Sequence, residues 1–278
     1  MDKTVLVMGS NGMLGHKLMQ VASKNFNTYG TIRGQSDNDR TIGFVSADNM
    51  ESVRKAMKLV LPDVVVNCIG IVKQSSNAND PLSAISINAL FPHKLARVCK
   101  QNNVRLIHIS TDCVFSGSSG YYFEDSLSDA IDMYGRTKYL GEVSYPNCLT
   151  LRTSMIGREL GTSNGLVEWF IKNNHCMVNG YTNSIFSGLT TLELSKVITN
   201  IIAKYPQLEG VYNVASHPIS KYYLLEFIKR IYELDITIVP DPSVECDRSL
   251  NSLRFFHDTN IPIPSWETMI ERMHADVI

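Results

Sequence analysis

The chain has 278 residues, of which 44% are hydrophobic and 19% charged, and its formal net charge is −1. This composition is typical of a globular protein with a sizeable core, and the near-zero charge excludes a field that would attract nucleic acid or an anionic membrane. No apolar run approaches the ~20 residues that span a bilayer. The first residues, MDKTVLVMGSNG, run into a strand pattern without a signal-peptide pattern, which predicts a cytoplasmic protein.

The first half of the chain alternates short apolar runs with helical patterns. The runs lack the period-two polarity of a half-exposed strand, so they predict buried strands of a parallel sheet with helices on both faces. Strands are predicted at 4–9, 27–33, 63–70, 104–111 and 148–157, and helices at 13–23, 50–60, 81–102 and around YGRTKYLGEV.

The rhythm of strand and helix weakens after residue 157. Helical patterns remain at 165–174, 190–205, 221–234 and near the end of the chain, with a short strand at 210–216. The pattern predicts an α/β protein with two parts. Residues 1–157 form a dinucleotide-binding domain, to which the chain returns around 190–216. Residues 158–189 and 217–278 form a smaller mixed α/β lobe that binds substrate.

Gly9, Gly12 and Gly15 follow the first strand directly and open a helix. Glycines at this spacing permit a tight turn and close approach of a pyrophosphate, to which the helix N-terminus offers free N–H groups. The context favours a dinucleotide site in a Rossmann-type doubly wound sheet over a turn that serves packing alone. The other residues of the predicted turn are Ser10, Asn11, Met13 and Leu14.

The end of the second strand decides which dinucleotide binds, because an acidic residue there would hold the ribose 2′-hydroxyl. The chain instead carries Arg33 in GTIRGQSDN. Arginine accommodates a 2′-phosphate, so NADP(H) is favoured and NAD(H) remains an alternative through Asp37 or Asp39. Asp48, after a predicted third strand, is a candidate contact of the adenine.

Tyr134 and Lys138 lie four residues apart in a predicted helix, and therefore on one face of it. A tyrosine hydroxyl has a pKa of about 10 in water, and a nearby cation stabilises the phenolate and lowers that value. The phenol then becomes a usable proton donor near neutral pH. The pair gains meaning from following a glycine turn and a strand that ends in Ser-Thr-Asp.

The motifs GSNGMLG, ISTDCVF and YGRTK, in this order and at these distances, resemble an extended short-chain dehydrogenase/reductase. More narrowly, nearly the whole chain resembles dTDP-4-dehydrorhamnose reductases and related enzymes of nucleotide-linked 4-keto sugars. The resemblance implies hydride transfer between a nicotinamide and a sugar carbonyl in polysaccharide precursor synthesis. It implies no metal, and neither the cysteines nor the histidines show metal-ligand spacing.

The resemblance assigns roles to the residues of these motifs. Tyr134 would protonate the ketone oxygen, and Lys138 would bind the nicotinamide ribose and lower the tyrosine pKa. Thr111, or Ser110 if the register slips by one residue, would orient the substrate oxygen. Asp112 would lie beside the sugar. The cofactor would also touch Cys68, Ile69 and Gly70, while Asn88 would tie its helix to the active-site strand.

Two departures from the rhamnose enzymes concern the sugar. Cys113 stands where they usually carry a tyrosine, and Met155 where they usually carry a tryptophan. The acetamido group of a UDP-linked 4-keto-6-deoxy-N-acetylhexosamine would need the room that a tryptophan takes, so such a substrate is a hypothesis beside dTDP-4-dehydrorhamnose. Further candidates for substrate binding are Lys73, Phe186 and Arg248.

Two other functions remain open. A nucleotide-sugar epimerase or dehydratase would share the fold, but dehydration typically needs Asp followed by Glu, and here Cys113 follows Asp112. A non-catalytic, NADP-binding regulatory subunit would be free to lose Tyr134 or Lys138, and both are present. A homodimer is common in the superfamily, although the sequence carries no distinct interface signal.

Overall fold

The computed structural model describes residues 3–73, 80–161 and 165–276. The chain forms two compact units. The first consists of residues 1–111, 131–152 and 195–212, and the second of residues 112–130, 153–194 and 213–278. That the lobe at 158–189 and 217–278 binds substrate stays a prediction, and 162–164 and 277–278 within it lie outside the described residues.

The first unit is built on a seven-stranded sheet with the order β11-β6-β5-β4-β1-β2-β3. β1 runs parallel to β2 and β4, β2 to β3, and β4 to β5. Because the chain order reverses between β1 and β4, the sheet is doubly wound as predicted, and its switch point lies between these strands. The strands are β1 (Thr4–Met8), β2 (Asn27–Thr31), β3 (Thr41–Ile42), β4 (Val64–Asn67), β5 (Arg105–Thr111), β6 (Cys148–Thr153) and β11 (Gly210–Asn213).

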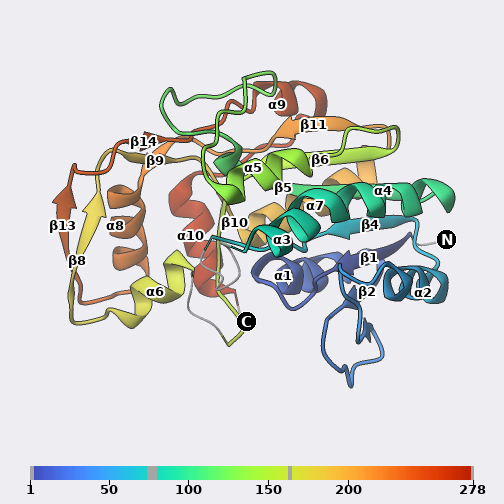
Figure 1. The fold of residues 1–278 in the computed structure, drawn as a ribbon. Helices are drawn as coiled ribbons and strands as arrows, with labels where there is room; N and C mark the ends of the chain where they lie inside the picture. Colours follow the sequence, from blue (N-terminus) through green and yellow to red (C-terminus); the bar gives the residue numbers. More distant parts are fainter. Residues whose placement is uncertain (1–2, 74–79, 162–164, 277–278) are drawn as a thin grey trace. The chain divides into compact units, whose positions relative to one another are not determined.

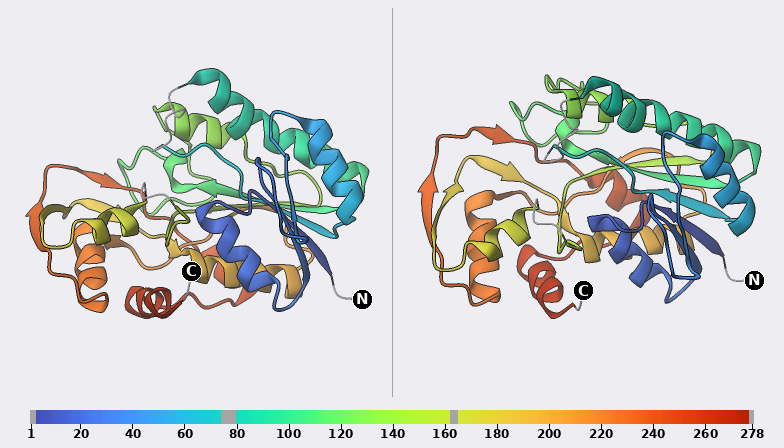
Figure 2. Two further views of the ribbon diagram at one scale, coloured as in Figure 1. Left: turned by 90° about the horizontal axis from the view of Figure 1, so that it is seen from below. Right: turned by 60° about the horizontal axis from the view of Figure 1, so that its bottom comes forward.

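Helices cover both faces of this sheet, as Figures 1 and 2 show. One face carries α2 and α4, whose side chains join those of β1, β4 and β5 in one apolar core. The other face carries α1, which contacts β1 and β2. The helices of this unit are α1 (Met13–Ala22), α2 (Met50–Val60), α3 (Pro81–Ala84), α4 (Phe91–Gln101), α5 (Met133–Leu140) and the greater part of α7 (Thr191–Lys204).

The long helix predicted at 81–102 contains a π-helical segment, η1 (Ile85–Leu90), between α3 and α4. Pro92 explains the break, because proline has no N–H to bond the carbonyl of Asn88 four residues earlier and its ring crowds that carbonyl. A widened π turn accommodates the interruption, and such turns recur at functional sites. The segment carries Asn88, whose side chain is buried.

The strand predicted at 148–157 is divided. β6 ends at Thr153, and β7 (Met155–Ile156) pairs instead with β10 (Leu189–Thr190) in the second unit. Short strands dominate this unit, as in β12-β9-β14 and β13-β8, and the sequence pattern predicted none of them. Its remaining elements are η2 (Asp112–Val114), α6 (Leu166–Lys172), β8 (Met177–Tyr181), β9 (Ser184–Phe186), β12 (Ile219–Ser220), α8 (Lys221–Ile231), β13 (Thr237–Asp241), β14 (Cys246–Asp247), α9 (Leu253–Thr259) and α10 (Trp266–Ala275).

Hydropathy and helix length decide whether a helix could span a membrane. Within residues 3–73, 80–161 and 165–276, no helix combines the length and apolar character needed to cross a bilayer.

Candidate active site

The glycine turn joins β1 to α1 and is anchored to the neighbouring strand. The amides of Gly9 and Ser10 bond to the Thr31 hydroxyl and carbonyl at 3.3 and 2.9 Å. Gly9 has a φ of +80°, a conformation that favours glycine. A Cβ on Gly15 would overlap the Gly9 carbonyl, so Gly15 is needed for the turn to close on itself.

Gly12 has a different position from Gly15. It is exposed, it is the N-cap of α1, and a Cβ there would lie 3.4 Å from the Gly9 carbonyl oxygen, an ordinary contact. Gly12 gives no side-chain cap to the helix, and the first turn has no acidic residue. A helix start of this kind suits an anionic ligand, because the dipole and backbone N–H groups favour negative charge. The turn therefore fits the pyrophosphate of a dinucleotide.

The segment after β4 lies beside this turn. A Cβ on Gly9 would be 3.0 Å from Ile69 Cγ1 and 3.6 Å from the carbonyl carbon of Cys68. Gly70 is exposed and has room around its Cα. The structure thus brings Gly9, Cys68 and Ile69 together at the carboxyl ends of β1 and β4, the place where doubly wound sheets bind ligands.

Arg33 and Asp48 are exposed residues of the first unit. Arg33 follows the end of β2, and Asp48 precedes Asn49, the N-cap of α2. Asp37, the alternative contact of a ribose, accepts a hydrogen bond from Gln35 Nε2 at 3.3 Å. Along the chain, Arg33 follows the end of β2 more closely than Asp37 does.

Tyr134 and Lys138 lie in α5, which begins at the N-cap Asp132. Tyr134 is partly exposed, whereas Lys138 is buried. The Lys138 ammonium donates to the carbonyl oxygen of Ile109 in β5 at 2.6 Å. Burial lowers the pKa of Lys138 to about 8, against the opposing attractions of Glu142 and Cys68. The ammonium is thus fixed beside the carboxyl end of β5 and remains mainly charged at neutral pH.

The register at the end of β5 distinguishes Ser110 from Thr111. The Ser110 hydroxyl donates to Glu142 Oε1 at 2.7 Å, so it is engaged with the segment that follows α5. Thr111 is the last residue of β5 and is buried. Neighbouring strand residues point to opposite faces. The arrangement favours Thr111 over Ser110 as the hydroxyl that orients a substrate.

Asn88 holds the loop after β4 through both atoms of its amide. Its Oδ1 accepts from the Ile71 amide at 2.8 Å, and its Nδ2 donates to the Ile71 carbonyl at 3.0 Å. Nδ2 also lies 3.5 Å from the Thr137 hydroxyl of α5. These bonds join η1 to the loop after β4 and to α5, whereas the resemblance had implied a tie to the active-site strand.

His108 is a fully buried residue of β5. Its Nδ1 lies 3.0 Å from Asn67 Nδ2, which is a donor, so Nδ1 accepts and the ring proton resides on Nε2. Burial, followed by the charge of Lys138 and the neighbouring His93, lowers the pKa of His108 well below its usual value. The imidazole therefore stays neutral, and its bond to Asn67 gives it a structural role between β4 and β5.

The second unit holds Asp112, Cys113 and Arg248. Asp112 is buried and opens η2. The Arg248 guanidinium donates to the carbonyl oxygens of Phe115 at 2.9 Å and Ser116 at 3.2 Å, and Nη1 lies 3.8 Å from Cys113 Sγ. These bonds give Arg248 a role in holding the loop that follows Thr111. Its contact with a diphosphate stays a prediction.

The three other residues predicted to bind substrate are Met155, Phe186 and Lys73. Met155 is partly buried at the start of β7. Phe186 is 8% exposed, and its ring centroid lies 5.2 Å from that of Trp266, which is a packing position. Lys73, in the first unit, forms an ion pair with Asp132 at 2.8 Å, at the N-cap of α5.

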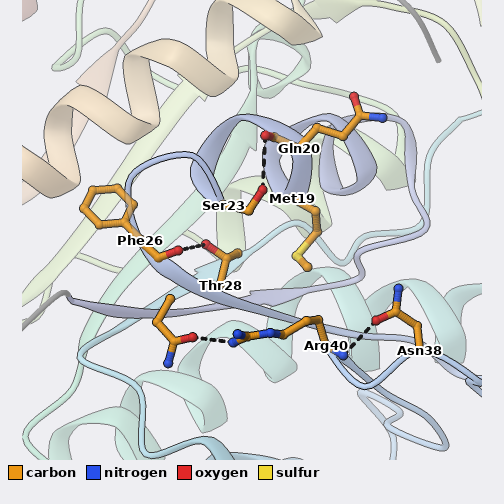
Figure 3. A pocket seen from close by; sticks show the side chains of 8 residues that line it. Met19, Gln20, Ser23, Phe26, Thr28, Asn38 and Arg40 are labelled. Carbon is orange, nitrogen blue, oxygen red and sulfur yellow. Dashed lines mark hydrogen bonds between the residues drawn. The ribbon is translucent and has the colours of Figure 1, made fainter.

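A hollow of about 350 Å³ lies elsewhere in the first unit, between the end of α1 and the beginning of β2. Figure 3 shows Arg40 among the side chains that line it, and Arg40 Nη1 donates to Asn27 Oδ1. None of the predicted site residues lines the hollow. It therefore does not mark the dinucleotide turn. Its lining residues are Met19, Gln20, Ser23, Phe26, Asn27, Thr28, Asn38 and Arg40. In the part of the chain that the structure describes, no group of three or more His, Cys, Asp or Glu could hold a metal.

Glu142 was not among the predicted site residues. Glu142 accepts from Ser110 and forms two hydrogen bonds with Arg152, both at 2.8 Å. The signal was present in the sequence, because Glu142 follows Lys138 by four residues in YGRTKYLGE. Its partner in a later strand could not be found from that spacing.

The model of the RmlD substrate binding domain family matches residues 3–178 of the chain. A dTDP-4-keto-6-deoxy-D-glucose reductase of Streptomyces niveus is 33% identical over 140 residues, which are 49% of this chain and 45% of that protein. The matched region spans about half the length of this and two other curated relatives.

Two solved structures share the fold. One is a dTDP-4-dehydrorhamnose reductase of Bacillus anthracis in complex with NADP, with a TM-score of 0.85, 22% identity and 99% of both chains covered. The other is the enzyme WbmG of Bordetella bronchiseptica in complex with NAD, with a TM-score of 0.80, 16% identity, and 99% of this chain and 94% of that chain covered. At these identities the likeness shows the fold, and it confirms the predicted Rossmann-type architecture.

Proposed function

The chain belongs to the RmlD substrate binding domain family, and from that membership we propose that it reduces the 4-keto group of a nucleotide-linked 6-deoxy sugar with NADPH. The observation that carries the proposal is the pair formed by Tyr134 and the buried Lys138 on α5. The helix is bonded to β5 through Ile109, and β5 ends at Thr111. The glycine turn belongs to the same unit.

The chain's own residues would hold the substrate oxygen and supply a proton. A bound NADPH would supply the hydride. The Thr111 hydroxyl orients the ketone oxygen, and the Tyr134 phenol donates a proton to it. The Lys138 ammonium stabilises the phenolate that remains, since an adjacent positive charge favours the charged form of the phenol. A positioned general acid of this kind contributes roughly 10²–10⁴-fold to the rate.

NADP(H) is the proposed cofactor, with the glycine turn on its pyrophosphate and Arg33 on its 2′-phosphate. Guanidinium binds phosphate bidentately, and Arg33 is exposed just beyond β2. The complex of the Bacillus anthracis reductase with NADP supports the choice. The complex of WbmG with NAD supports NAD(H) as the alternative.

Two substrates are compatible with the site. The names of the relatives support a dTDP-linked 4-keto-6-deoxy sugar. Cys113 and Met155, smaller or more flexible than the residues expected there, favour a sugar with an added acetamido group, such as a UDP-linked 4-keto-6-deoxy-N-acetylhexosamine. The nucleotide and the C2 substituent are the two properties that distinguish these substrates.

A panel of nucleotide 4-keto sugars tests the proposal. Purified protein is mixed with NADPH or NADH and with dTDP- or UDP-linked 4-keto-6-deoxy sugars, with and without a 2-acetamido group, and the absorbance of the reduced nicotinamide is followed. We expect oxidation of NADPH with at least one substrate and slower oxidation of NADH. Absence of turnover across the panel contradicts the proposal. Stoichiometric NAD⁺ released on denaturation would instead favour an epimerase.

A further inference from the structure

A buried carboxylate lies directly after α5. Glu142 Oε1 accepts hydrogen bonds from Ser110 Oγ at 2.7 Å and from Arg152 Nε at 2.8 Å, while Oε2 accepts from Arg152 Nη2 at 2.8 Å. The side chains of Arg152 and Glu142 are 5% and 6% exposed. Two parallel bonds between a guanidinium and a carboxylate fix both groups in one geometry. The carboxylate therefore joins the end of α5 to β5 and β6.

The same carboxylate acts on Lys138. Burial alone favours the neutral amine at that position, and Glu142 opposes this effect. Two other titratable groups interact with the charge of Lys138, namely Cys68 after β4 and His108 in β5, and Tyr134 lies one turn before Lys138 on α5. Burial raises the pKa of Cys68 to about 12 and lowers that of His108 well below its usual value, so both are uncharged at neutral pH. Of Glu142, Cys68 and His108, only Glu142 carries a negative charge, in its ion pair with Arg152.

We propose that Glu142 is a positioning residue of the reducing site, which holds α5, and with it Lys138, against the Ile109–Thr111 end of β5. A negative charge held at this place favours the protonated form of Lys138. Arg152 fixes the carboxylate through two hydrogen bonds, and the Ser110 hydroxyl of β5 donates a third. The inference rests on the proposed function for its catalytic meaning. The predicted effect of Glu142 on the protonation of Lys138 is independent of that function, because it is measured on the protein alone.

The substitutions Glu142→Gln and Arg152→Gln have opposite expected effects on Lys138. Glu142→Gln keeps the size of the side chain but removes the negative charge and leaves two buried cations. Lys138 should then lose its proton at a lower pH, by about one unit, the lower end of the effect of a close opposite charge. Arg152→Gln removes the positive charge that neutralises the Glu142 carboxylate, so the carboxylate should stabilise the Lys138 ammonium more strongly. Lys138 should then lose its proton at a higher pH.

The titration of Lys138 can be measured directly. Lysine labelled with ¹³C at Cε gives signals that report protonation, and the spectrum of Lys138→Met identifies the signal of Lys138 by its loss. In the unsubstituted protein we expect a midpoint near 8, as burial dictates. Glu168→Gln is the matched control, because Glu168 also pairs with an arginine, Arg158 at 2.5 Å, but belongs to the second unit.

The outcomes separate this inference from the proposed function. A lower midpoint in Glu142→Gln, unchanged in Glu168→Gln, supports the inference; equal midpoints in all three proteins overturn it. If Glu142→Gln does not fold, Arg152→Gln alone provides the test: a higher midpoint of Lys138 supports the inference, and an unchanged midpoint overturns it.

Activity provides a second readout. The high-pH loss of NADPH oxidation should move to lower pH in Glu142→Gln and stay in place in Glu168→Gln. A uniform loss of activity at every pH, with the midpoint of Lys138 unchanged, assigns Glu142 a purely structural role and overturns the inference. If the unsubstituted protein reduces no 4-keto sugar, the proposed function fails, while the titration still decides whether Glu142 controls Lys138.

Discussion

At the scale of single residues, the chemistry depends on a lysine that is buried without losing its charge. The Lys138 ammonium is bonded to the Ile109 carbonyl, and the attraction of Glu142 opposes the effect of burial on its pKa. A lysine on the exposed face of α5 would be solvated and mobile, with little influence on a neighbouring phenol. Burial thus gives Lys138 both its fixed position and its susceptibility to pH.

Replacement of Tyr134 by Phe should abolish the reduction and spare cofactor binding. The phenol is the proposed proton donor, and its loss should lower kcat by roughly 10²–10⁴-fold. NADPH affinity, measured by fluorescence titration, should change little. The matched control is Tyr139→Phe, on the same helix and 44% exposed, which should retain full activity. Full activity of Tyr134→Phe would remove the proposed acid.

The pH dependence follows from Lys138. Its pKa is lowered to about 8, so the ammonium is present below that pH and is lost as the pH rises through it. We expect kcat/KM for NADPH-dependent reduction to fall above about pH 8. Lys138→Arg retains a charged group, so any activity that remains in it should lack this decline. The same decline in Lys138→Arg would assign it to another group.

At the scale of the elements, two glycines of the turn have different roles: Gly15 is required by packing, whereas Gly12 is proposed to face the ligand. Gly15→Ala places a methyl group on the Gly9 carbonyl and should destabilise the fold by about 1–3 kcal/mol, as overpacking generally does. Gly12→Ala meets only an ordinary contact and should leave stability within about 0.5 kcal/mol.

Thermal or urea unfolding measures these differences in stability, and NADPH titration adds the second part of the prediction. Gly12→Ala should weaken NADPH binding while it remains folded, because its methyl group projects where the pyrophosphate is proposed to approach. Normal binding by Gly12→Ala together with normal stability of Gly15→Ala would contradict the assignment of the turn.

The contact between η1 and α5 makes a further prediction. Gly141 allows α5 to approach the Asn88 carbonyl, and a Cβ there would overlap that oxygen. Gly141→Ala should therefore destabilise the fold by about 1–3 kcal/mol. Gly34→Ala is the control, because nothing lies within 4 Å of a Cβ at Gly34. Equal unfolding midpoints for the two variants would contradict the close approach.

The sheet and the glycine turn could be predicted because their signals are local. A β-branched run such as residues 64–67 identifies a buried strand, and Gly9, Gly12 and Gly15 specify the turn by spacing alone. The π turn at 85–90 could not be predicted from a helical pattern, since it depends on how Pro92 interrupts one backbone bond. The partners of Ser110 and Asn88 come from tertiary packing, which no local pattern records.

At the scale of the whole molecule, the sequence predicted two parts and a return of the chain to the first. The structure has two units, and residues 195–212 belong to the first of them. The division falls between Thr111 and Asp112, inside the motif ISTDCVF, which the sequence pattern treated as one piece. Strands such as β7 and β10 have two residues each, too few for a periodic signal, and for this reason the second unit escaped detailed prediction.

The glycine turn proposed to bind the cofactor and the proposed acid, Tyr134, both belong to the first unit. One crystal structure of the protein with NADP therefore tests the central claim most directly. We expect density for the pyrophosphate over the turn from Gly9 to Gly15, with the nicotinamide and its ribose beside Tyr134 and Lys138. A nicotinamide far from the Tyr134 phenol, or a crystal grown in excess NADP with no dinucleotide at this turn, would contradict the account.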